Sequence, residues 1–226
     1  MSKHRKRKHV IGPNKVLTQA EQQQLIDYLA GRQRSAISKK FVRFETATAG
    51  QALLIVELFL CTGLRVAELA ALRVADTPIV LGLDAVMVYR GKNNKDRTVP
   101  ISARLAKLIE EFVKDYRNQT LPRHVRTRDY LKPLFYSTQR RRPFSTNGLY
   151  RKIRQAAEHA GLLKRLTPHM LRHSFATNAL RANVNIYKLQ MLMGHESLAT
   201  TAGYLHLVDV DKGLGNTLDV RGTQAG

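Results

Sequence analysis

Residues 167–177 read TPHMLRHSFAT, and they predict a helix that presents a basic face to a functional site. The opening Thr-Pro pair is typical of a helix cap followed by a first-turn proline. His169, Arg172 and His173 stand at i, i+3 and i+4, so they share one face, while apolar residues on another face anchor the helix to a core. A polar cluster on such a helix indicates a site; the alternative is two surface histidines beside a solvated arginine.

The same spacing also allows a metal site, because histidines at i and i+4 are a zinc-ligand pattern. Arg172, however, would place a fixed positive charge beside the cation, and no Glu follows the first histidine as it does in the hydrolase motif. We therefore expect neither a metal nor any other cofactor.

Two further stretches supply groups of a similar kind. Residues 62–69 read TGLRVAEL, in which Arg65 stands at a sharp junction between helices and Glu68, one turn later, can hold it in an ion pair. Residues 193–195 read MGH, and Tyr204 comes nine residues after His195. Two arginines, three imidazoles and a phenol suit attack on a phosphodiester without a metal, because guanidinium groups grip phosphate oxygens in bidentate fashion and stay charged.

Tyr204 is the candidate nucleophile. An unperturbed phenol has a pKa of about 10, and neighbouring positive charges stabilise its phenolate. Attack on phosphorus would form a phosphotyrosyl ester and free a sugar hydroxyl, so the bond energy is retained and religation needs no ATP. Tyr187 is the nearest rival, but its neighbours Ile186 and Leu189 predict a place in the core.

Lys92 is the candidate proton donor to the leaving alkoxide, because the pKa of a lysine falls readily near other cations. It lies in residues 91–96, GKNNKD, a turn-rich connector between two predicted strands. Lys95 competes for the same role, and a solvated turn lysine is the alternative.

The composition points to a polyanionic partner. The 226 residues include 38 Lys and Arg against 17 Asp and Glu, a formal net charge of +21. Such a balance indicates nucleic acid, either for a DNA-acting enzyme or for a non-specific basic binder such as a ribosomal protein. The lone Cys61 excludes an internal disulfide and fits a small core residue. With no signal peptide or bilayer-spanning run, we expect a cytoplasmic, nucleoid-associated protein without a membrane partner.

Periodicity predicts a mainly α chain with one small antiparallel β-sheet (α+β). The expected helices are residues 18–30, 50–62, 66–72, 145–160, 185–193 and 197–203, together with the one opened by Pro168 and one capped by Ser102. Residues 31–40 are expected to form a polar loop, and residues 85–90 and 97–101 to form a hairpin.

Basic segments lie outside these elements. Residues 1–16 are expected to form a flexible arm, whose cations are Lys3, Arg5, Lys6, Arg7 and Lys8. A second run, Arg140, Arg141 and Arg142, precedes Pro143 and is expected in a loop. Runs of this kind bind phosphates without reading sequence, although a merely solvated arm is equally consistent with the composition.

Taken together, the motifs resemble the tyrosine recombinase (phage integrase) family from about Val16 to Tyr204. Five elements occur in the family's order: TGLR at 62–65, the Gly-Lys-rich hairpin at 91–97, HMLRH at 169–173, MGH at 193–195, then the tyrosine. Each alone is modest, but all five at family-like spacing are specific. The resemblance implies a tyrosine recombinase catalytic-domain fold over residues 17–208 and a site-specific DNA strand-exchange enzyme of the kind found in mobile genetic elements.

The resemblance also implies a role for each site residue. Arg65 and Arg172 clamp the scissile phosphate, and Tyr204 attacks it to give a 3′-phosphotyrosyl link. Lys92 acts as general acid toward the 5′-oxygen, while His169 and His195 hydrogen-bond the phosphate and assist proton transfer. Glu68 supports the arginines, and His173 is structural.

Other expectations concern assembly. The family acts on double-stranded DNA as a tetramer, a dimer of dimers, and the resemblance allows accessory DNA-bending proteins. Residues 209–226 are expected to be a tail that docks on a neighbouring protomer. Because only the basic arm precedes the catalytic region, the chain resembles minimal fimbrial-switch invertases and some mobile-element integrases, with the arm and the Arg140–Arg142 loop partly replacing the usual DNA clamp. A type IB-like topoisomerase and a catalytically silent DNA-binding regulator are the alternatives.

Overall fold

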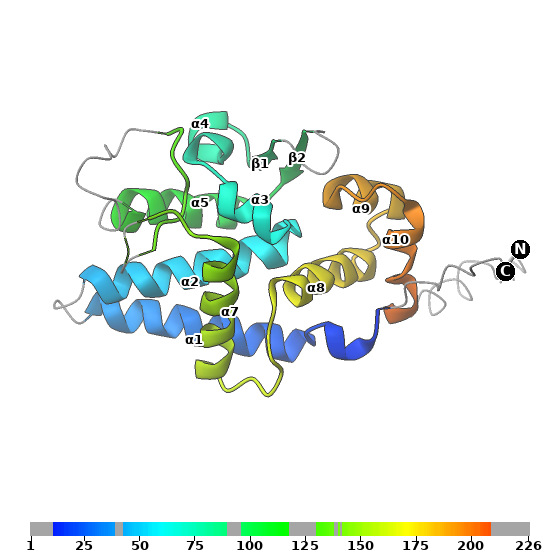
Figure 1. The fold of residues 1–226 in the computed structure, drawn as a ribbon, viewed down its shortest axis with the longest axis horizontal. Coiled ribbons are helices and arrows are strands. Elements are labelled where there is room, and N and C mark those ends of the chain that lie inside the picture. The colour runs from blue at the N-terminus through cyan, green and yellow to red at the C-terminus, as the bar shows by residue number, and fades with distance from the viewer. Residues whose placement is uncertain are drawn as a thin grey trace, which may run out of the picture.

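A computed structural model describes residues 11–38, 43–89, 96–117, 130–137, 140 and 142–208. These residues form a mainly helical fold with one two-stranded antiparallel sheet, which confirms the predicted fold class (Figure 1). The elements in chain order are η1 (Pro13–Lys15), α1 (Gln19–Ser38), α2 (Arg43–Thr62), α3 (Val66–Ala71), η2 (Val74–Asp76), α4 (Pro78–Leu81), β1 (Ala85–Val88), β2 (Arg97–Pro100), α5 (Ala103–Glu111), the π-helical η4 (Phe112–Arg117), α7 (Thr146–His159), α8 (Pro168–Arg181), α9 (Ile186–Met193), α10 (Leu198–Ala202) and η5 (Leu205–Leu207).

The two longest helices, α1 and α2, lie side by side along the molecule (Figure 1). The predicted capping box opens α1: the Glu21 amide donates to Thr18 Oγ1 at 3.1 Å, and the Thr18 amide donates to Glu21 Oε2 at 2.7 Å. The predicted loop at 31–40 is wrong over residues 31–38, where α1 continues to Ser38. Gly31 alone weakens a helix by only about 1 kcal/mol, and the Arg and Gln residues after it favour helix.

Helix α2 is buried almost all round in its C-terminal half, as its apolar run predicts. Gly63 ends the helix with a φ of +61°, a conformation that favours glycine. A Cβ at this position would stand 2.3 Å from Cδ1 of Phe175, so the absence of a side chain also lets α8 approach the end of α2. The turn at Gly63 leads directly into α3, which begins one residue after Arg65.

The predicted hairpin is present. Strands β1 and β2 pair antiparallel, with Val86 opposite Val99 and Val88 opposite Arg97. Val86 and Val99 are almost completely buried. Residues 90–95, and with them the candidate acid Lys92, lie outside the described residues. The Ser102 hydroxyl accepts from the Leu105 amide at 3.3 Å, which confirms the predicted cap of α5.

The predicted C-terminal helices are also confirmed, as α7 through α10. Part of this region packs around a second hydrophobic core, separate from the main one that surrounds α2. The buried members of this second core are Ile11, Val16, Ala176, Leu180, Leu189, Met193 and Tyr204. The fold therefore places the candidate nucleophile in a different core from the end of α2.

Tyr187 is not a core residue, which corrects the prediction for the rival tyrosine. Its residue surface is 61% exposed, whereas Leu189 and Met193 on the same helix are fully buried. Leu189 and Met193 are four residues apart and share one face of the helix. Tyr187, two residues before Leu189, points to the opposite face.

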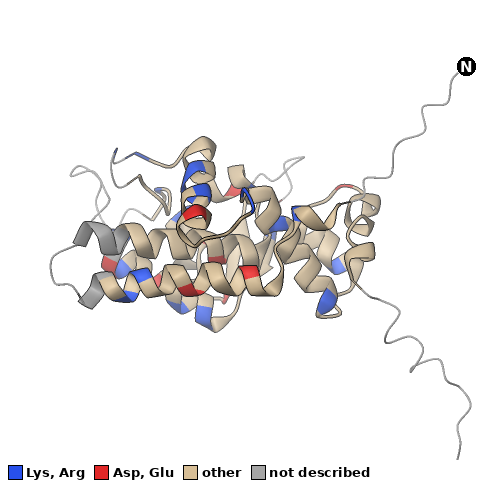
Figure 2. Cartoon of the chain, turned by 90° about the horizontal axis from the view of Figure 1, so that it is seen from below, with Lys and Arg blue, Asp and Glu red and all other residues tan. Residues whose placement is uncertain are grey.

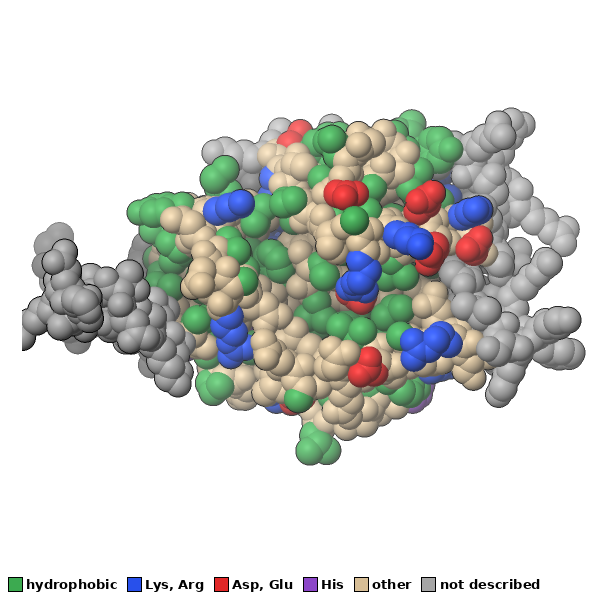
Figure 3. Space-filling view, turned by 180° about the vertical axis from the view of Figure 1, so that it is seen from behind, with side chains coloured by type: hydrophobic (Ala, Val, Ile, Leu, Met, Phe, Trp, Pro, Cys, Tyr) green, Lys and Arg blue, Asp and Glu red, His purple; other side chains and the backbone are tan. Residues whose placement is uncertain are grey.

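Charges are spread unevenly over the described part of the chain. Lys and Arg residues occur on several helices and on the loops between elements (Figure 2). The described surface seen from behind carries acidic side chains among the basic ones (Figure 3). That surface is of mixed charge, although the whole sequence is strongly basic. Of the helices in the described ranges, none combines the length and apolar character that crossing a bilayer requires.

Candidate active site

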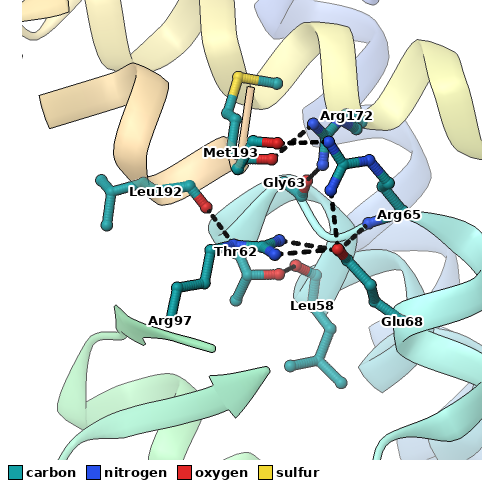
Figure 4. Close-up of polar contacts among 10 residues, drawn as sticks. Leu58, Thr62, Gly63, Arg65, Glu68, Arg97, Arg172, Leu192 and Met193 are labelled. Atoms are coloured by element: carbon teal, nitrogen blue, oxygen red, sulfur yellow. Dashed lines mark hydrogen bonds and ion pairs between the residues drawn. The ribbon is translucent and has the colours of Figure 1, made fainter. Parts of the chain in front are cut away.

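Arg65 and Arg172 both reach the C-terminal end of helix α9 (Figure 4). Arg172 donates through Nη2 to the Met193 carbonyl at 2.7 Å and through Nη1 to the carbonyl of Gly63. Arg65 donates through Nη2 to the Gly194 carbonyl. Cations are favourable at a helix C-terminus, because its last carbonyls lack partners and carry the negative end of the helix dipole. The two arginines, 107 positions apart in the sequence, therefore meet at one helix end.

Gly194 permits this close approach. It caps α9 with a φ of +61°, and a Cβ there would stand 3.0 Å from Nη1 of Arg97 and 3.3 Å from Nη1 of Arg65. The Met-Gly-His motif thus has a structural explanation: its glycine reverses the chain and leaves room for two guanidinium groups.

Glu68 is the acidic residue that holds this group of arginines together. Its Oε1 accepts from Arg65 Nη1 at 2.9 Å, and its Oε2 accepts from the Arg65 amide at 2.7 Å. The predicted Arg65–Glu68 pair is therefore present. Burial alone would raise the pKa of Glu68, but hydrogen bonds and charge from Arg97 and Arg65 outweigh it and lower the pKa to about 2. The carboxylate is ionised throughout the neutral range.

Arg97 is a site residue that the sequence reasoning missed. It donates in bidentate fashion to Glu68, at 2.9 Å from Nη1 and 2.8 Å from Nη2, and its Nε donates to the Leu192 carbonyl at 2.8 Å. The sequence did carry a signal for this position. Arg97 stands two residues before the buried Val99 in strand β2, and residues two apart in a strand point to the same face, here the inward one. An arginine on an inward face needs a carboxylate partner.

We call Arg65, Glu68, Arg97 and Arg172 the arginine cradle. Three guanidinium groups against one carboxylate leave an excess of two positive charges, which suits a polyanionic ligand. Arg172 is only 6% exposed, and burial together with the nearby charge of Arg65 lowers its pKa to about 10. It therefore remains charged at neutral pH. Its hydrogen bonds within the described residues use two of its five N–H donors, one on each terminal nitrogen.

Tyr204 lies beside two histidines. Its Oη is 2.7 Å from Nδ1 of His173, and its ring stacks almost parallel on that of His195, with centroids 6.4 Å apart and an angle of 6°. Tyr204 is 2% exposed, and burial raises its pKa to about 12 against the opposite effect of Arg172. We call residues 198–208, which comprise α10, Tyr204 and η5, the tyrosine segment.

His195 is held in place from within the tyrosine segment. Its Nδ1 is 2.9 Å from the hydroxyl oxygen of Thr201, which is fully buried. Burial, followed by the charges of Arg172 and Arg65, lowers the pKa of His195 to about 3. The ring is therefore neutral at neutral pH and can donate one N–H.

Other predicted residues lie apart from this group or outside the described residues. His169 is exposed, and its ring lies 6.5 Å from that of Tyr150 rather than beside Tyr204. Arg140 and Arg142 lie outside helices and strands, as expected for a loop, and the Ser137 amide donates to the Arg142 carbonyl at 2.7 Å. Outside the described residues lie Arg141, Lys92 and the arm cations Lys3, Arg5, Lys6, Arg7 and Lys8.

Cys61 is poorly suited to act as a nucleophile. Burial, then the charge of Glu57, raises its pKa to about 11, so the thiolate is scarce at neutral pH. In the ranges that the structure describes, no three His, Cys, Asp or Glu side chains are grouped so as to hold a metal ion.

Comparison with known proteins assigns the family. The sequence profile described as "Phage integrase family" matches residues 15–210, most of the chain. The chain belongs to the phage integrase family. Among its relatives are a tyrosine recombinase of Pseudothermotoga lettingae, 36% identical over 77% of this chain and 55% of the relative, and the tyrosine recombinase XerC of Roseiflexus sp., 35% identical over 68% of this chain and 46% of the relative. The chain spans about half the length of these relatives of the phage integrase family.

Solved structures agree with this assignment. The XerA recombinase matches with a TM-score of 0.65 at 29% identity, over 96% of this chain and 65% of that one. The catalytic domain of bacteriophage HP1 integrase matches with a TM-score of 0.56 at 21% identity, over 93% of this chain and 98% of that one, and shows the shared fold alone. The integrase fold predicted from the motifs is therefore confirmed.

Proposed function

We propose that this chain is a site-specific DNA recombinase that cleaves and rejoins double-stranded DNA through Tyr204. The observation that carries the proposal is the meeting of a phenol, two imidazoles and the charge of Arg172 in one largely buried site beside the arginine cradle. The phenol, the imidazoles and Arg172 come from α8 and the turns after α9 and α10, and the rest of the arginine cradle comes from α3, the residue before it and β2. The relatives' printed names, tyrosine recombinase and XerC, point to the same chemistry.

In the proposed reaction, the scissile phosphate takes its place against Arg65 and Arg172 and displaces some of their main-chain contacts. The Tyr204 oxygen forms a bond to phosphorus, and the bond from phosphorus to the 5′-oxygen breaks. The products are a 3′-phosphotyrosyl ester and a 5′-hydroxyl, to which Lys92 gives a proton. Positive donors aimed at the phosphoryl oxygens stabilise the charge that develops in the transition state. Attack by a second 5′-hydroxyl reverses these steps and completes the exchange.

The buried position of Tyr204 implies one further step. A side chain that is 2% exposed cannot meet a DNA phosphate without movement, so DNA binding must open the tyrosine segment. Short elements favour such movement: α10 has five residues and η5 has three. His195 lies outside this segment but is coupled to it, since its Nδ1 is paired with the Thr201 hydroxyl and its ring lies parallel to that of Tyr204.

The remaining parts of the proposal concern assembly. Residues 17–208 form the catalytic domain, and residues 209–226 dock on a neighbouring protomer in a tetrameric synapse. The predicted flexible arm is corrected over residues 11–16, where Ile11 and Val16 are buried in the second core, so the DNA contacts of the basic arm are proposed for residues 1–10. Residues Arg140–Arg142 add phosphate contacts, accessory DNA-bending proteins assist, and the protein is associated with the nucleoid in the cytoplasm. Its strong positive charge supports DNA as the partner.

A covalent trapping assay tests this function. Suicide substrates are made from DNA that flanks the gene, and protein–DNA adducts are counted for the wild type and for Tyr204→Phe. Adducts that require Tyr204 are expected, with DNA binding unchanged in the variant. Recombinant product from a two-site plasmid separates a recombinase from a topoisomerase, which would only relax it. Wild-type protein that binds DNA but never forms adducts would identify a silent regulator.

A further inference from the structure

Residues 11–16, which we call the N-terminal strap, run beside helix α8 toward the tyrosine segment (Figure 1). Two side chains of the strap, those of Ile11 and Val16, are 5% and 7% exposed, and both belong to the second hydrophobic core, as Tyr204 does. The three residues of η1, which lie between them, are exposed. The strap is therefore held at its two ends, and both ends contribute to the core in which the candidate nucleophile is buried.

The inner end of the strap is fastened to α8 by a buried polar network. The amide of Leu17, the next residue, donates to Ser174 Oγ at 2.9 Å, and the Leu17 carbonyl accepts from Gln22 Nε2 at 3.0 Å. The Gln22 side chain in turn accepts from Asn178 Nδ2 at 2.8 Å. Because Leu17 and Ser174 are fully buried, water cannot readily replace these hydrogen bonds. This end is fixed to the helix that carries Arg172.

The outer end of the strap is tied to the tyrosine segment. Nε2 of His206 lies 2.8 Å from the carbonyl oxygen of Ile11, and because a carbonyl only accepts, the imidazole donates this hydrogen bond. Leu207 and Val208, which follow, are half-buried against the same core as the Ile11 side chain. His206 is exposed, so this tie lies at the surface, unlike the network at Leu17. The outer end can therefore come away while the inner end holds.

The strap stabilises the buried position of Tyr204. Opening of the tyrosine segment, which the proposed reaction requires, would separate Leu207 and Val208 from the core that Ile11 helps to form and would break the His206 hydrogen bond. Exposure of buried aliphatic surface to water costs free energy in proportion to its area. While the strap is in place, the segment therefore opens less often.

The positive charge that attracts DNA stands directly before the strap in the sequence. Residues 1–10 include five lysines and arginines, which are Lys3, Arg5, Lys6, Arg7 and Lys8. A chain of ten residues can reach at most about 35 Å from a fixed Ile11, and release of the strap as far as Leu17 adds about 20 Å. A longer reach brings more phosphates within contact, and each contact releases counterions. DNA therefore binds the released state better and shifts the equilibrium toward it.

We propose that the N-terminal strap is an autoinhibitory latch, which holds the tyrosine segment closed until DNA binds the basic residues before it and draws the strap away. This inference rests on the proposed function and adds a control to it: cleavage is coupled to occupation of the basic arm. Without DNA, the Ile11 end of the strap stays on the second core and Tyr204 stays buried. With DNA on the arm, the outer end leaves and the segment is free to open.

Three proteins separate the latch from its release. In the first, Ile11→Ala removes an anchoring side chain from the second core. In the second, which we call the arm-neutral variant, the five cations of residues 1–10 are all replaced by alanine and the strap is left intact. The third combines the two changes. Ile153→Ala, which truncates a buried isoleucine in the main core on α7, is the matched control.

The measurement is single-turnover formation of Tyr204 adducts on a suicide substrate made from DNA that flanks the gene, at concentrations that saturate each protein. We expect Ile11→Ala to speed adduct formation by roughly tenfold, because truncation of a buried isoleucine removes much of what holds the segment closed. The arm-neutral variant should be slower than wild type by a similar factor, and the combined protein should regain at least the wild-type rate. Ile153→Ala should cleave like wild type.

A second pair of variants tests the latch at an exposed position, where folding is least affected. His206→Ala removes the hydrogen bond to the Ile11 carbonyl, whereas His206→Gln keeps a side-chain N–H donor. His206→Ala should speed adduct formation by roughly threefold, and His206→Gln should stay near wild type. Amide hydrogen exchange of residues 198–208 gives a readout that needs no cleavage: on addition of the DNA, exchange should rise in wild type and stay low in the arm-neutral variant.

Three results would overturn the latch. Unchanged or slower cleavage by Ile11→Ala would show that the strap does not restrain the segment. A wild-type rate in the arm-neutral variant at saturating DNA would show that the arm does not release the strap. A combined protein as slow as the arm-neutral variant would show that arm and strap act separately. Absence of Tyr204 adducts in every protein would instead remove the proposed function, and the exchange measurement would still decide whether the strap restrains the segment.

Discussion

The two halves of the site are held in different ways. The arginine cradle is fixed by bidentate pairs and main-chain carbonyls: Glu68 bridges Arg65 and Arg97, and three arginines bind successive carbonyls from Leu192 to Gly194. The tyrosine segment consists of short elements, and Tyr204 belongs to the second, smaller hydrophobic core.

This difference separates binding from attack. Charge-assisted, bidentate contacts are among the strongest in proteins, so the arginine cradle is arranged before DNA arrives. The tyrosine segment must move for its buried phenol to meet a phosphate. We infer that the cradle supplies a rigid phosphate site and that the tyrosine segment controls when cleavage occurs.

The largest effect should follow from breaking the cradle at Arg172. Arg172→Ala removes a phosphate ligand and leaves the Gly63 and Met193 carbonyls without their partner, so adduct formation should fall by roughly 10³-fold or more. Arg172→Lys should not restore it, because one ammonium cannot span both carbonyls in a planar fork. Single-turnover cleavage measures the loss; activity within tenfold of wild type in Arg172→Ala would contradict a phosphate-binding role.

A second test uses pH to measure how much the ionised Glu68 of the cradle contributes to the stability of the fold. Glu68 has a pKa lowered to about 2 in the folded chain from a reference of 4.5, so its ion pairs stabilise the fold above pH 4.5 and are lost as pH falls toward 2. A difference of that size corresponds to on the order of 3 kcal/mol. Urea unfolding of wild type and Glu68→Gln should therefore differ at pH 6 and converge near pH 2. A gap that stays constant across this range would mean that ionised Glu68 does not stabilise the fold.

The third test concerns Arg97, which ties the β-hairpin to the cradle. Arg97→Ala should lower cleavage by about tenfold to a hundredfold, because Glu68 and the Leu192 carbonyl each lose a partner and the carboxylate that holds Arg65 is then less firmly positioned. Arg73→Ala is a matched control: Arg73 also forms a bidentate pair, with Asp76, but is more exposed and does not contact the cradle. Equal cleavage defects in the two variants would indicate a general stability effect.

The smallest effect is expected within the tyrosine segment. Thr201→Val keeps the shape of a fully buried side chain but removes the hydroxyl paired with His195, which should slow cleavage by less than about tenfold. Thr200→Val, on an exposed position of the same helix, is the control. Cleavage of Thr201→Val as slow as that of Arg172→Ala would mean that the tyrosine segment is as rigidly prearranged as the cradle.

Much of the fold and part of the site could be predicted from the sequence. Caps at Thr18, Ser102 and Thr167, the stop at Gly63 and the alternating hairpin strands are local signals, since each depends on residues within about one turn. The loop expected at 31–40 is wrong over residues 31–38, because a single glycine weakens a helix by only about 1 kcal/mol and the Arg and Gln residues after Gly31 favour helix.

Site residues were predicted by type and motif, but their contacts were not. His169, expected beside the phosphate, is exposed, while His173, expected to be structural, touches the phenol oxygen. The inward direction of Arg97 could be read from strand alternation, but its pairing with Glu68 across 29 residues could not.

The sequence by itself determined the helical elements, the glycine turns and the set of chemical groups, because these depend on neighbours along the chain. Only the tertiary structure decided which nitrogen meets the Tyr204 oxygen and which carbonyls the arginines bind. Those pairs join residues from 21 to 129 positions apart, and their geometry depends on how α3, α8 and α9 pack, which no local pattern specifies.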